Sequence, residues 1–330
     1  MYIRNALISG LAAASTVQAY GSYANYTIRD ETEWIVASPA PTVEKRLFGK
    51  IFGLIGNIFG NNQQQAECPA VWNQISKTLT QQFLADGQCT DAARAAIRSS
   101  FHDCFPGACD GSLILADECS KSESRGLERL CGNLANVASQ TNVGVADLIQ
   151  FAAAHAVKTC PGGPTIPVFV GRKDSSEVND YSILPSAFAK GGDLVQLFAS
   201  KGFSAFDLAA LIGAHSTAKQ RFVDPSQAGA SLDSTVGIWD VKYYSETIKG
   251  NAPFILESDK NIAQHPLTAL PFASFAISQG AWDFAFVSAM KKMSMMGVDR
   301  RGLIDCTSAL PGGSKKRDVK RSNIFDRLKW

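Results

Sequence analysis

Strong net charge, strand alternation and long apolar runs are all lacking in this sequence. The formal net charge is only +2, and no basic stripe with interleaved aromatic residues marks the middle of the chain, so we expect no nucleic-acid partner. The apolar run from Ala6 to Val17 is too short to cross a bilayer, which argues against stable membrane insertion. Because strand alternation is nearly absent and no internal repeat is found, the sequence predicts a mainly α fold.

The N-terminus has the features of a secretory signal peptide over residues 1–19. Arg4 precedes the apolar run, and Val17-Gln18-Ala19 has the pattern of a cleavage site. We therefore expect a secreted, extracellular protein. In that compartment the eight cysteines form disulfides rather than free thiols or metal ligands.

Composition divides the rest of the 330 residues into three parts. Residues 20–66 are polar and then apolar with many glycines, and the dibasic pair Lys45-Arg46 suggests a pro-region. Residues 67–311 form the expected folded domain, and residues 312–330 a basic, disordered tail. Helices are expected within the domain over seven ranges: Val71–Phe83, Asp91–His102, Gly126–Ser139, Val145–Val157, Asp193–Ser200, Ser204–His215 and Phe272–Met296.

The stretch from Arg98 to Ser112 holds the first group of reactive side chains. Thr90 and Asp91 are placed to cap the helix that runs into it. Arg98 and His102 stand four residues apart, so both side chains project from one face of that helix. A permanently charged guanidinium beside an imidazole combines a fixed cation with a proton acceptor.

Oxygen ligands for a hard cation follow directly after this pair. Asp103, Asp110 and Ser112 crowd into a short Gly-containing loop, as calcium requires, and Cys104 and Cys109 are placed to close it with a disulfide. Two other interpretations are a surface Arg/His pair without function and a zinc knuckle. The excess of oxygen donors and the oxidising compartment argue against zinc.

This stretch resembles the distal helix and calcium loop of plant-type haem peroxidases, through the pattern Arg-x-x-Phe-His-Asp followed by Asp-Gly-Ser. The resemblance implies that Arg98 and His102 are the distal catalytic pair. It makes Phe101 the aromatic wall over the haem. It assigns the distal calcium to four residues: Asp103, Ala108 through its backbone carbonyl, Asp110 and Ser112.

A second histidine lies in a comparable setting in the C-terminal half. The stretch Ser204-Ala-Phe-Asp207 offers a capping box, and the helix that it opens places His215 on an apolar face. A histidine on such a face is usually a packed core residue. Here Ser216 follows directly, and a second oxygen-rich loop spans Asp233–Asp240. With only four histidines in the chain, two beside such loops favour a functional role.

This half resembles class II of the same family, the secreted fungal peroxidases. Gly-Ala-His215-Ser is similar to the proximal haem-ligand motif, and Leu256-Glu-Ser-Asp259 to the motif of the acid that raises the basicity of the proximal imidazole. The resemblance assigns the proximal calcium to Ser216, Asp233, Thr235, Ile238 through its carbonyl, and Asp240. It implies haem b, two calcium ions and a haem held between a distal and a proximal helix.

Two features bear on how far this resemblance extends. The Asn that normally bonds the distal histidine is missing, and Ser124 or Glu123 is expected to substitute for it. Cysteine connectivity cannot be fixed by sequence alone. Class II suggests Cys68–Cys306 and Cys89–Cys160, the plant class suggests Cys104–Cys109, and Cys119 and Cys131 are left for a fourth bridge.

Four positions, located by counting residues from Arg98 and His215, indicate which electron donors the enzyme can use. Manganese-oxidising relatives place three acids where this chain has Asp91, Ala95 and Arg221. One acid, one methyl group and one cation cannot hold a divalent ion, because Arg221 repels it and too few oxygens remain. Lignin-type relatives place a surface Trp where this chain has Ala210.

The resemblance therefore implies a secreted, monomeric haem peroxidase that uses hydrogen peroxide to oxidise small phenolic or dye-like aromatic donors at the haem edge. Two alternatives stay open: a manganese- or lignin-type peroxidase, and a calcium-stapled binding protein of the same fold without catalysis. The other two histidines are expected to be structural, His155 packed in a helix and His265 in a loop. The methionines between Met290 and Met296 are expected to fill the core.

Overall fold

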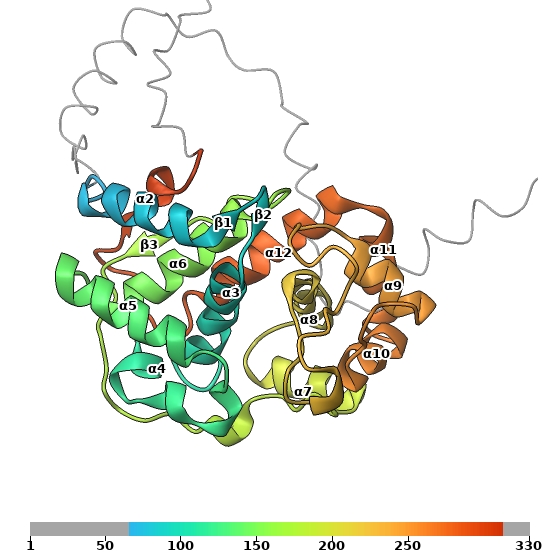
Figure 1. The fold of residues 1–330 in the computed structure, drawn as a ribbon. Coiled ribbons are helices and arrows are strands. Elements are labelled where there is room, and N and C mark those ends of the chain that lie inside the picture. The colour runs from blue at the N-terminus through green and yellow to red at the C-terminus, as the bar shows by residue number, and fades with distance from the viewer. Residues whose placement is uncertain (1–65, 313–330) are drawn as a thin grey trace, which may run out of the picture. The chain divides into compact units, whose positions relative to one another are not determined.

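The computed structural model describes residues 66–312, in which helices dominate as predicted (Figure 1). The α-helices are α2 (Val71–Phe83), α3 (Asp91–Cys104), α4 (Ser112–Leu115), α5 (Glu128–Thr141), α6 (Val145–Thr159), α7 (Gly191–Ser200), α8 (Ala205–Leu211), α9 (Lys242–Lys249), α10 (Glu257–Gln264), α11 (Ala269–Ile277) and α12 (Gln279–Met293). Two short antiparallel sheets pair β1 (Leu84–Ala85) with β2 (Gln88–Cys89) and β3 (Phe169–Val170) with the distant β4 (Ile304–Asp305). The predicted signal peptide, and nearly all of the predicted pro-region and tail, lie outside the described residues, and the predicted domain boundaries stay predictions.

The helices sort into two groups that each pack around their own partners (Figure 1). In the first group α3 runs along α6, and α2 and α5 also pack on α6. In the second group α8 packs against α12, and α9 against α11. The distal pair belongs to the first group and the proximal histidine to the second, so the predicted site needs residues from both helix groups.

Helix α3 begins at a side-chain cap and buries an alanine-rich face. The Thr90 hydroxyl accepts a hydrogen bond from the Ala93 N–H at 3.3 Å, which satisfies one of the free donors of the first turn. Ala93, Ala96 and Ile97 are buried, so α3 approaches α6 closely. This packing holds the last turn of α3, with its reactive side chains, in a fixed orientation.

Three expectations about the helices need correction. The helix predicted over Phe272–Met296 is two helices, because the chain breaks at Ser278, whose extended backbone and side chain cap α12 through the Ala281 N–H. The helix predicted to reach His215 ends at Leu211, and a 3-10 turn over Ile212–Thr217 carries the histidine. Helices α9 and α10 were not expected, since each is short and lies among loop-like motifs.

All four cysteine pairs suggested above are present as disulfides: Cys68–Cys306, Cys89–Cys160, Cys104–Cys109 and Cys119–Cys131. They leave no free cysteine in the part of the chain that the structure describes. Across residues 66–312 no single helix is long and apolar enough to cross a membrane. One pair of helices, Gly191–Ser200 with Ala205–Thr217, meets that test jointly, but it is bent by 105°.

Candidate active site

Arg98 and His102 meet as the spacing on α3 predicts. The Arg98 Nε–H donates to His102 Nε2 at 3.0 Å. The other two guanidinium nitrogens donate to the backbone carbonyls of Glu123 at 2.7 Å and Arg125 at 2.8 Å. The loop that follows α4 therefore fixes the guanidinium above the imidazole.

These contacts determine the tautomer of His102. Because Nε2 accepts a hydrogen bond from Arg98, the proton of the neutral ring lies on Nδ1. Nδ1 lies 3.4 Å from the hydroxyl oxygen of Ser124, which is fully buried. The carboxylate of Glu123 instead accepts a hydrogen bond from Ser122. Of the two residues expected to replace the missing Asn, Ser124 rather than Glu123 thus lies next to His102 Nδ1.

His102 is held as a neutral base. The side chain is buried, and its desolvation together with the charge of Arg98 holds the pKa of the imidazole well below its usual range. The Tyr181 hydroxyl donates to the backbone carbonyl of His102 at 2.9 Å and anchors this turn of α3. A neutral imidazole whose Nε2 carries an electron pair rather than a proton is suited to accept a proton once the Arg98 N–H moves away.

Phe101 lies on the same turn and is anchored by other aromatic rings. It stacks on Phe105 with ring centroids 4.6 Å apart, and Phe198 of α7 packs against both rings. The Phe101 ring meets the His102 ring edge-on at 6.1 Å. This rigid side chain is in position to serve as the predicted aromatic wall.

On the proximal side, His215 is paired with a buried acid. Its Nδ1 lies 3.0 and 3.1 Å from the two carboxylate oxygens of Asp259, which α10 carries and which is only 1% exposed. Loss of solvation lowers the pKa of His215, but the charge and hydrogen bond of Asp259 outweigh this, so the net shift is upward. Both recorded hydrogen bonds of the ring use Nδ1, and Nε2 is left as a ligand atom.

The end of α3 and the loop and turn that follow it bury two acids, Asp103 and Glu118. Asp103 is fully buried, and one of its carboxylate oxygens has no hydrogen-bond partner. Burial, and then the nearby charge of Asp110, raise the pKa of Asp103 to about 8. In the same segment, the Ser112 hydroxyl lies 3.3 Å from the buried carboxylate of Glu118. Ala108, whose carbonyl was predicted as a further ligand, lies between Cys104 and Asp110 in this loop.

The 3-10 turn and the loop that follows it also hold buried oxygen atoms that lack hydrogen-bond partners. Ser216 and Asp233 are both fully buried, and each has an oxygen without a partner. Burial raises the pKa of Asp233 to about 7. The Thr235 hydroxyl donates to Asp240 at 2.9 Å, and the Ile238 N–H donates to the Thr235 carbonyl at 2.7 Å.

Orphaned polar atoms provide a test of the calcium prediction. In residues 66–312 five buried side-chain polar atoms lack a hydrogen-bond partner: those of Asp103, Arg172, Ser216, Asp233 and Tyr243. Three of the five belong to predicted calcium ligands, so a cation in each loop would supply the missing partner. No group of three or more His, Cys, Asp or Glu side chains is placed to hold a metal in this part of the chain. The two sets fit calcium through their mixture of carboxylate, hydroxyl and carbonyl oxygens.

Three residues of the site had no sequence signal. Glu118 is fully buried and accepts a hydrogen bond from the Asn179 N–H at 2.6 Å, and the Asn179 side chain donates to Ser112 at 2.7 Å. Tyr181 follows closely and holds His102, as described. A buried Glu in a polar loop is indistinguishable in sequence from an exposed one, and the segment 179–181 reaches α3 only through the fold.

Comparison with known proteins identifies the family of this chain. A family model described as "Peroxidase" matches residues 71–278. The chain belongs to the peroxidase family. Relatives include manganese peroxidase 3 of Phlebia radiata (28% identical, covering 79% of this chain and 85% of the relative). A low-redox potential peroxidase of Taiwanofungus camphoratus is 33% identical over 76% of this chain and 84% of the relative, and ligninase C of Trametes versicolor is 27% identical over 76% and 77%.

Membership of the peroxidase family implies haem and a hydrogen-peroxide oxidoreductase. The residues fit a haem: His215 has a free Nε2 and 34% of its side chain is exposed. Besides the loss of solvation, the charge of Arg98 also lowers the pKa of His215, though the effect of Asp259 prevails. The names of the relatives differ in electron donor, and the family does not by itself decide the donor of this peroxidase.

The fold brings together Asp91 and Arg221, two of the positions that bear on the electron donor. Asp91 and Arg221 meet, with Arg221 Nη2 3.7 Å from a carboxylate oxygen of Asp91. Ala95 lies one turn further along α3. Ala210 is fully buried, and its carbonyl accepts a hydrogen bond from the Trp282 indole at 3.0 Å. At the positions that the resemblance compares with a manganese site and a surface indole, this peroxidase thus has Arg221 beside Asp91 and a buried alanine.

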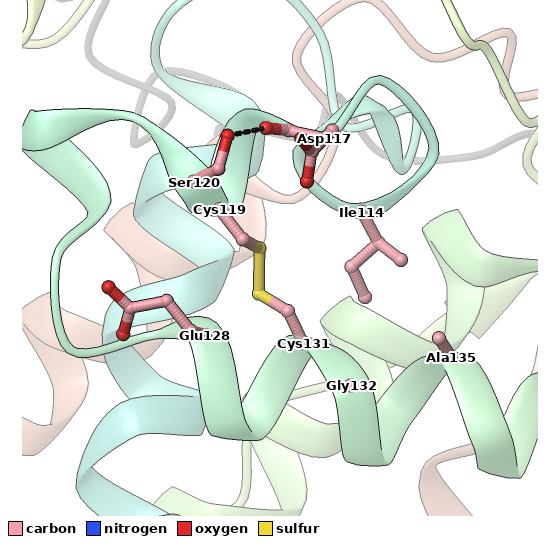
Figure 2. Close-up of a pocket in the computed structure, with 8 residues that line it drawn as sticks. All are labelled: Ile114, Asp117, Cys119, Ser120, Glu128, Cys131, Gly132 and Ala135. Atoms are coloured by element: carbon pink, nitrogen blue, oxygen red, sulfur yellow. Dashed lines mark hydrogen bonds between the residues drawn. A yellow bond between two sulfur atoms is a disulfide. The ribbon is translucent and has the colours of Figure 1, made fainter.

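A cavity of about 330 Å³ lies elsewhere, beside the Cys119–Cys131 disulfide (Figure 2). Its polar rim comes from Asp117, Ser120 and Glu128. None of the distal, proximal or calcium residues lines it. The chemistry of the site therefore rests on the two histidine systems and not on this cavity.

Proposed function

We propose that this peroxidase is a secreted enzyme that uses hydrogen peroxide to oxidise small phenols and dyes at an exposed haem edge. The main observation behind the proposal is that the pKa values of two histidines are shifted in opposite directions. His102 is a neutral base beside Arg98, whereas His215 gains basicity from Asp259. A peroxide-splitting centre needs both, a proton acceptor on one side of the haem and an electron-rich ligand on the other.

His215 would hold the haem iron through Nε2. When bound, the haem supplies the redox chemistry that breaks the O–O bond and accepts electrons from donors. Asp259 would keep the Nδ1 proton of His215 hydrogen-bonded, which makes Nε2 a stronger ligand. Phe101 would limit the space above the haem.

His102 would take a proton from hydrogen peroxide at Nε2 and return it to the departing oxygen, as general base and then general acid. The Arg98 Nε–H must first leave Nε2, which it occupies at 3.0 Å. Once free, the guanidinium would stabilise the negative charge that develops on the departing oxygen. Ser124 would keep the proton of the resting ring on Nδ1, so that Nε2 is always the basic atom.

Two calcium ions would support the site from both sides. The distal ion would bind at Asp103, Asp110, Ser112 and the Ala108 carbonyl, and the proximal ion at Ser216, Asp233, Thr235, Asp240 and the Ile238 carbonyl. The unpartnered oxygens of Asp103, Ser216 and Asp233 support both assignments. Because Asp103 directly follows His102 and Ser216 directly follows His215, each ion would fix a catalytic turn.

Small donors at the haem edge are favoured over manganese and over bulky lignin units. The pairing of Arg221 with Asp91 supports the exclusion of a divalent ion, because a cation already satisfies the acid. The burial of Ala210 supports the exclusion of a surface electron relay. The signal-peptide pattern and the four disulfides support secretion.

The test is a visible spectrum of the haem-loaded, secreted protein. We expect a Soret band that shifts on addition of one equivalent of hydrogen peroxide and returns on addition of a small phenol. We also expect steady turnover of phenols and sulfonated dyes. A haem-free protein with bound calcium and a flat visible spectrum would instead favour the non-catalytic binding protein.

A further inference from the structure

Four oxidisable aromatic rings lead away from the proximal histidine. Tyr243 of α9 meets the His215 ring edge-on, with centroids 5.8 Å apart. Tyr244 lies 5.2 Å from Tyr243, and Trp282 of α12 lies 5.6 Å from Tyr244. Trp239 then stacks on Trp282 at 4.7 Å with only 8° between the ring planes. Each ring is in van der Waals contact with the next, so electrons have a continuous aromatic path.

The path is closely fitted to the segment that carries His215. A Cβ atom at Gly213 would collide with the Tyr244 hydroxyl and the Trp282 indole nitrogen, so these two rings press directly on the backbone two residues before the histidine. The Trp282 indole also donates to the Ala210 carbonyl, and the Tyr244 hydroxyl to the Ala209 carbonyl at 2.8 Å. All four rings are at most 1% exposed, so no donor molecule can touch them.

The four rings differ in what their protons can reach. An indole or phenol that loses an electron becomes strongly acidic, and it forms a neutral radical only where a base takes its proton. Trp282 and Tyr244 donate to peptide carbonyls, which do not accept a proton. The Tyr243 hydroxyl lies near Asp259 without a close hydrogen bond, and both oxygens of that carboxylate already face Nδ1 of His215. The Trp239 indole N–H donates to a carboxylate, Oδ1 of the partly exposed Asp283, at 3.3 Å.

We propose that Trp239, stacked on Trp282, is an internal electron donor that receives one oxidising equivalent when hydrogen peroxide reacts and no external donor is present. This proposal rests on the proposed function through His215 as the haem ligand. One electron leaves the Trp239 indole and passes by way of Trp282, Tyr244 and Tyr243 to the His215 side. The indole N–H bond breaks, its proton goes to Asp283, and a neutral indolyl radical remains.

The oxidant is hydrogen peroxide, which accepts two electrons and two protons on reduction to two water molecules. Trp239 provides one of these electrons, and the haem group, when bound, would provide the other. The Trp239 proton stays on Asp283, so the protons that water formation needs come from solvent. The buried radical cannot act on donors by contact. It therefore holds an equivalent that would otherwise oxidise exposed side chains at random, and it is reduced again when a donor reaches the haem.

The experiment follows the haem-loaded protein after one equivalent of hydrogen peroxide without donor. Electron paramagnetic resonance of the frozen sample should show a tryptophanyl radical, whose hyperfine pattern changes when the protein carries ring-deuterated tryptophan. Peptide mass spectrometry after repeated peroxide additions should find oxidised Trp239. This second measurement uses the unaltered protein, so it does not depend on any variant that folds poorly.

Four variants assign the signal. Trp239→Phe keeps an aromatic ring in the stack and should lose the signal. Trp282→Phe should lose it although Trp239 is still present, because the path is interrupted. Asp283→Asn keeps a hydrogen-bond acceptor but cannot take the proton, and should also abolish the neutral radical. Trp72→Phe is the matched control: Trp72 is 3% exposed, contacts Phe151 in the other helix group, and should leave the signal unchanged.

The outcomes separate this inference from the proposed function. If peroxide does not change the visible spectrum of the haem-loaded protein, the proposed function fails. If the spectrum changes but the radical persists in the Trp239→Phe variant, or oxidation products appear elsewhere while Trp239 stays intact, then only this inference is overturned. In that case the stacked indoles serve packing alone.

Discussion

Arg221 Nη2 lies 3.7 Å from Oδ2 of Asp91, and Lys219 lies 3.7 Å from the other oxygen of the same carboxylate. Arg94 adds two hydrogen bonds to that oxygen, at 2.6 and 3.1 Å. The hydrogen bond from Arg94, with the charges of the three cations, lowers the pKa of Asp91 although partial burial opposes this. Three cations around one acid leave a positive surface at the position that the resemblance assigns to a manganese site.

This surface predicts that manganese(II) is not a substrate. We expect no saturable manganese(II) oxidation, measured as manganese(III) chelate formation with peroxide. The double variant Ala95→Glu with Arg221→Glu supplies two further acids beside Asp91 and should introduce saturable oxidation. Ala95→Glu alone is the control, since Arg221 remains. Half-saturation of the unaltered enzyme in the micromolar range would contradict the assignment.

His102→Leu should slow the reaction with hydrogen peroxide by roughly 10²–10⁴-fold, the loss typical of removing a general base. Haem should stay bound, because its ligand is proposed to be His215. Stopped-flow measurement of the first peroxide-dependent spectral change tests this. His265→Leu, at the end of α10, is the control and should react normally. An unchanged rate in His102→Leu would remove this residue from the mechanism.

Ser124→Ala should slow the peroxide reaction about two- to tenfold, the effect of losing one neutral hydrogen bond of about 0.5–1.5 kcal/mol. Without this acceptor the protonated imidazole is less stable, so the pKa of His102 falls further and the acid limb of the rate moves to lower pH. The KM for a phenol should not change. Ser124→Asn should restore the rate.

Ser100→Ala is the matched control for Ser124→Ala. Ser100 is also a fully buried serine near His102, but its hydroxyl donates to the backbone carbonyl of Ile97 within α3. This variant should keep both the rate and the pH profile. Equal effects of the two substitutions would mean that Ser124 acts through packing and not through the imidazole.

Metal analysis should find two calcium ions per chain, and Asp103→Asn and Asp233→Asn should each remove one. Because calcium binds the folded chain, free calcium at a hundred times its Kd stabilises the fold by about 2.7 kcal/mol per site. A chelator should lower Tm and loosen haem, and added calcium should reverse both. Asp117→Asn, an exposed residue of the same loop region, should have no effect. Active protein without calcium would rule these sites out.

Acid should destabilise the fold through His155. This buried imidazole bonds Ser76, Thr80 and Thr159, and burial lowers its pKa to about 4. Since the unfolded chain protonates near pH 6.5 and the folded chain only near 4, the folded state is favoured above that range. The free energy of unfolding should fall by up to about 3 kcal/mol as pH drops through it.

His155→Gln isolates this effect from other acid-sensitive groups. Denaturant titrations between pH 7 and 4 should show a flatter pH dependence in the variant, whatever its stability at neutral pH. His265→Gln should keep the slope of the unaltered protein. Parallel slopes for His155→Gln and the unaltered protein would assign the acid sensitivity to other residues.

Several features of this protein follow from the sequence by itself, because they depend on spacing within a single helix or turn. Thr90 caps α3, and Ser204 and Asp207 form the expected capping box at α8. The four-residue spacing of Arg98 and His102 brings their side chains into contact on any α-helix. Three disulfide pairs agree with the resemblance, and the fourth, Cys119–Cys131, is the pair that elimination left.

Only the tertiary structure decided the contacts between segments far apart in the chain. The choice of Ser124 over Glu123, the burial of Glu118 and the stacking of Trp239 on Trp282 depend on how helices and loops pack. The break at Ser278 was missed because apolar residues continue across it, and the cap of α12 forms only where two helices turn against α8. Local spacing determines which side chains share a helix face. Burial, and with it pKa and partner, is set by what packs on that face.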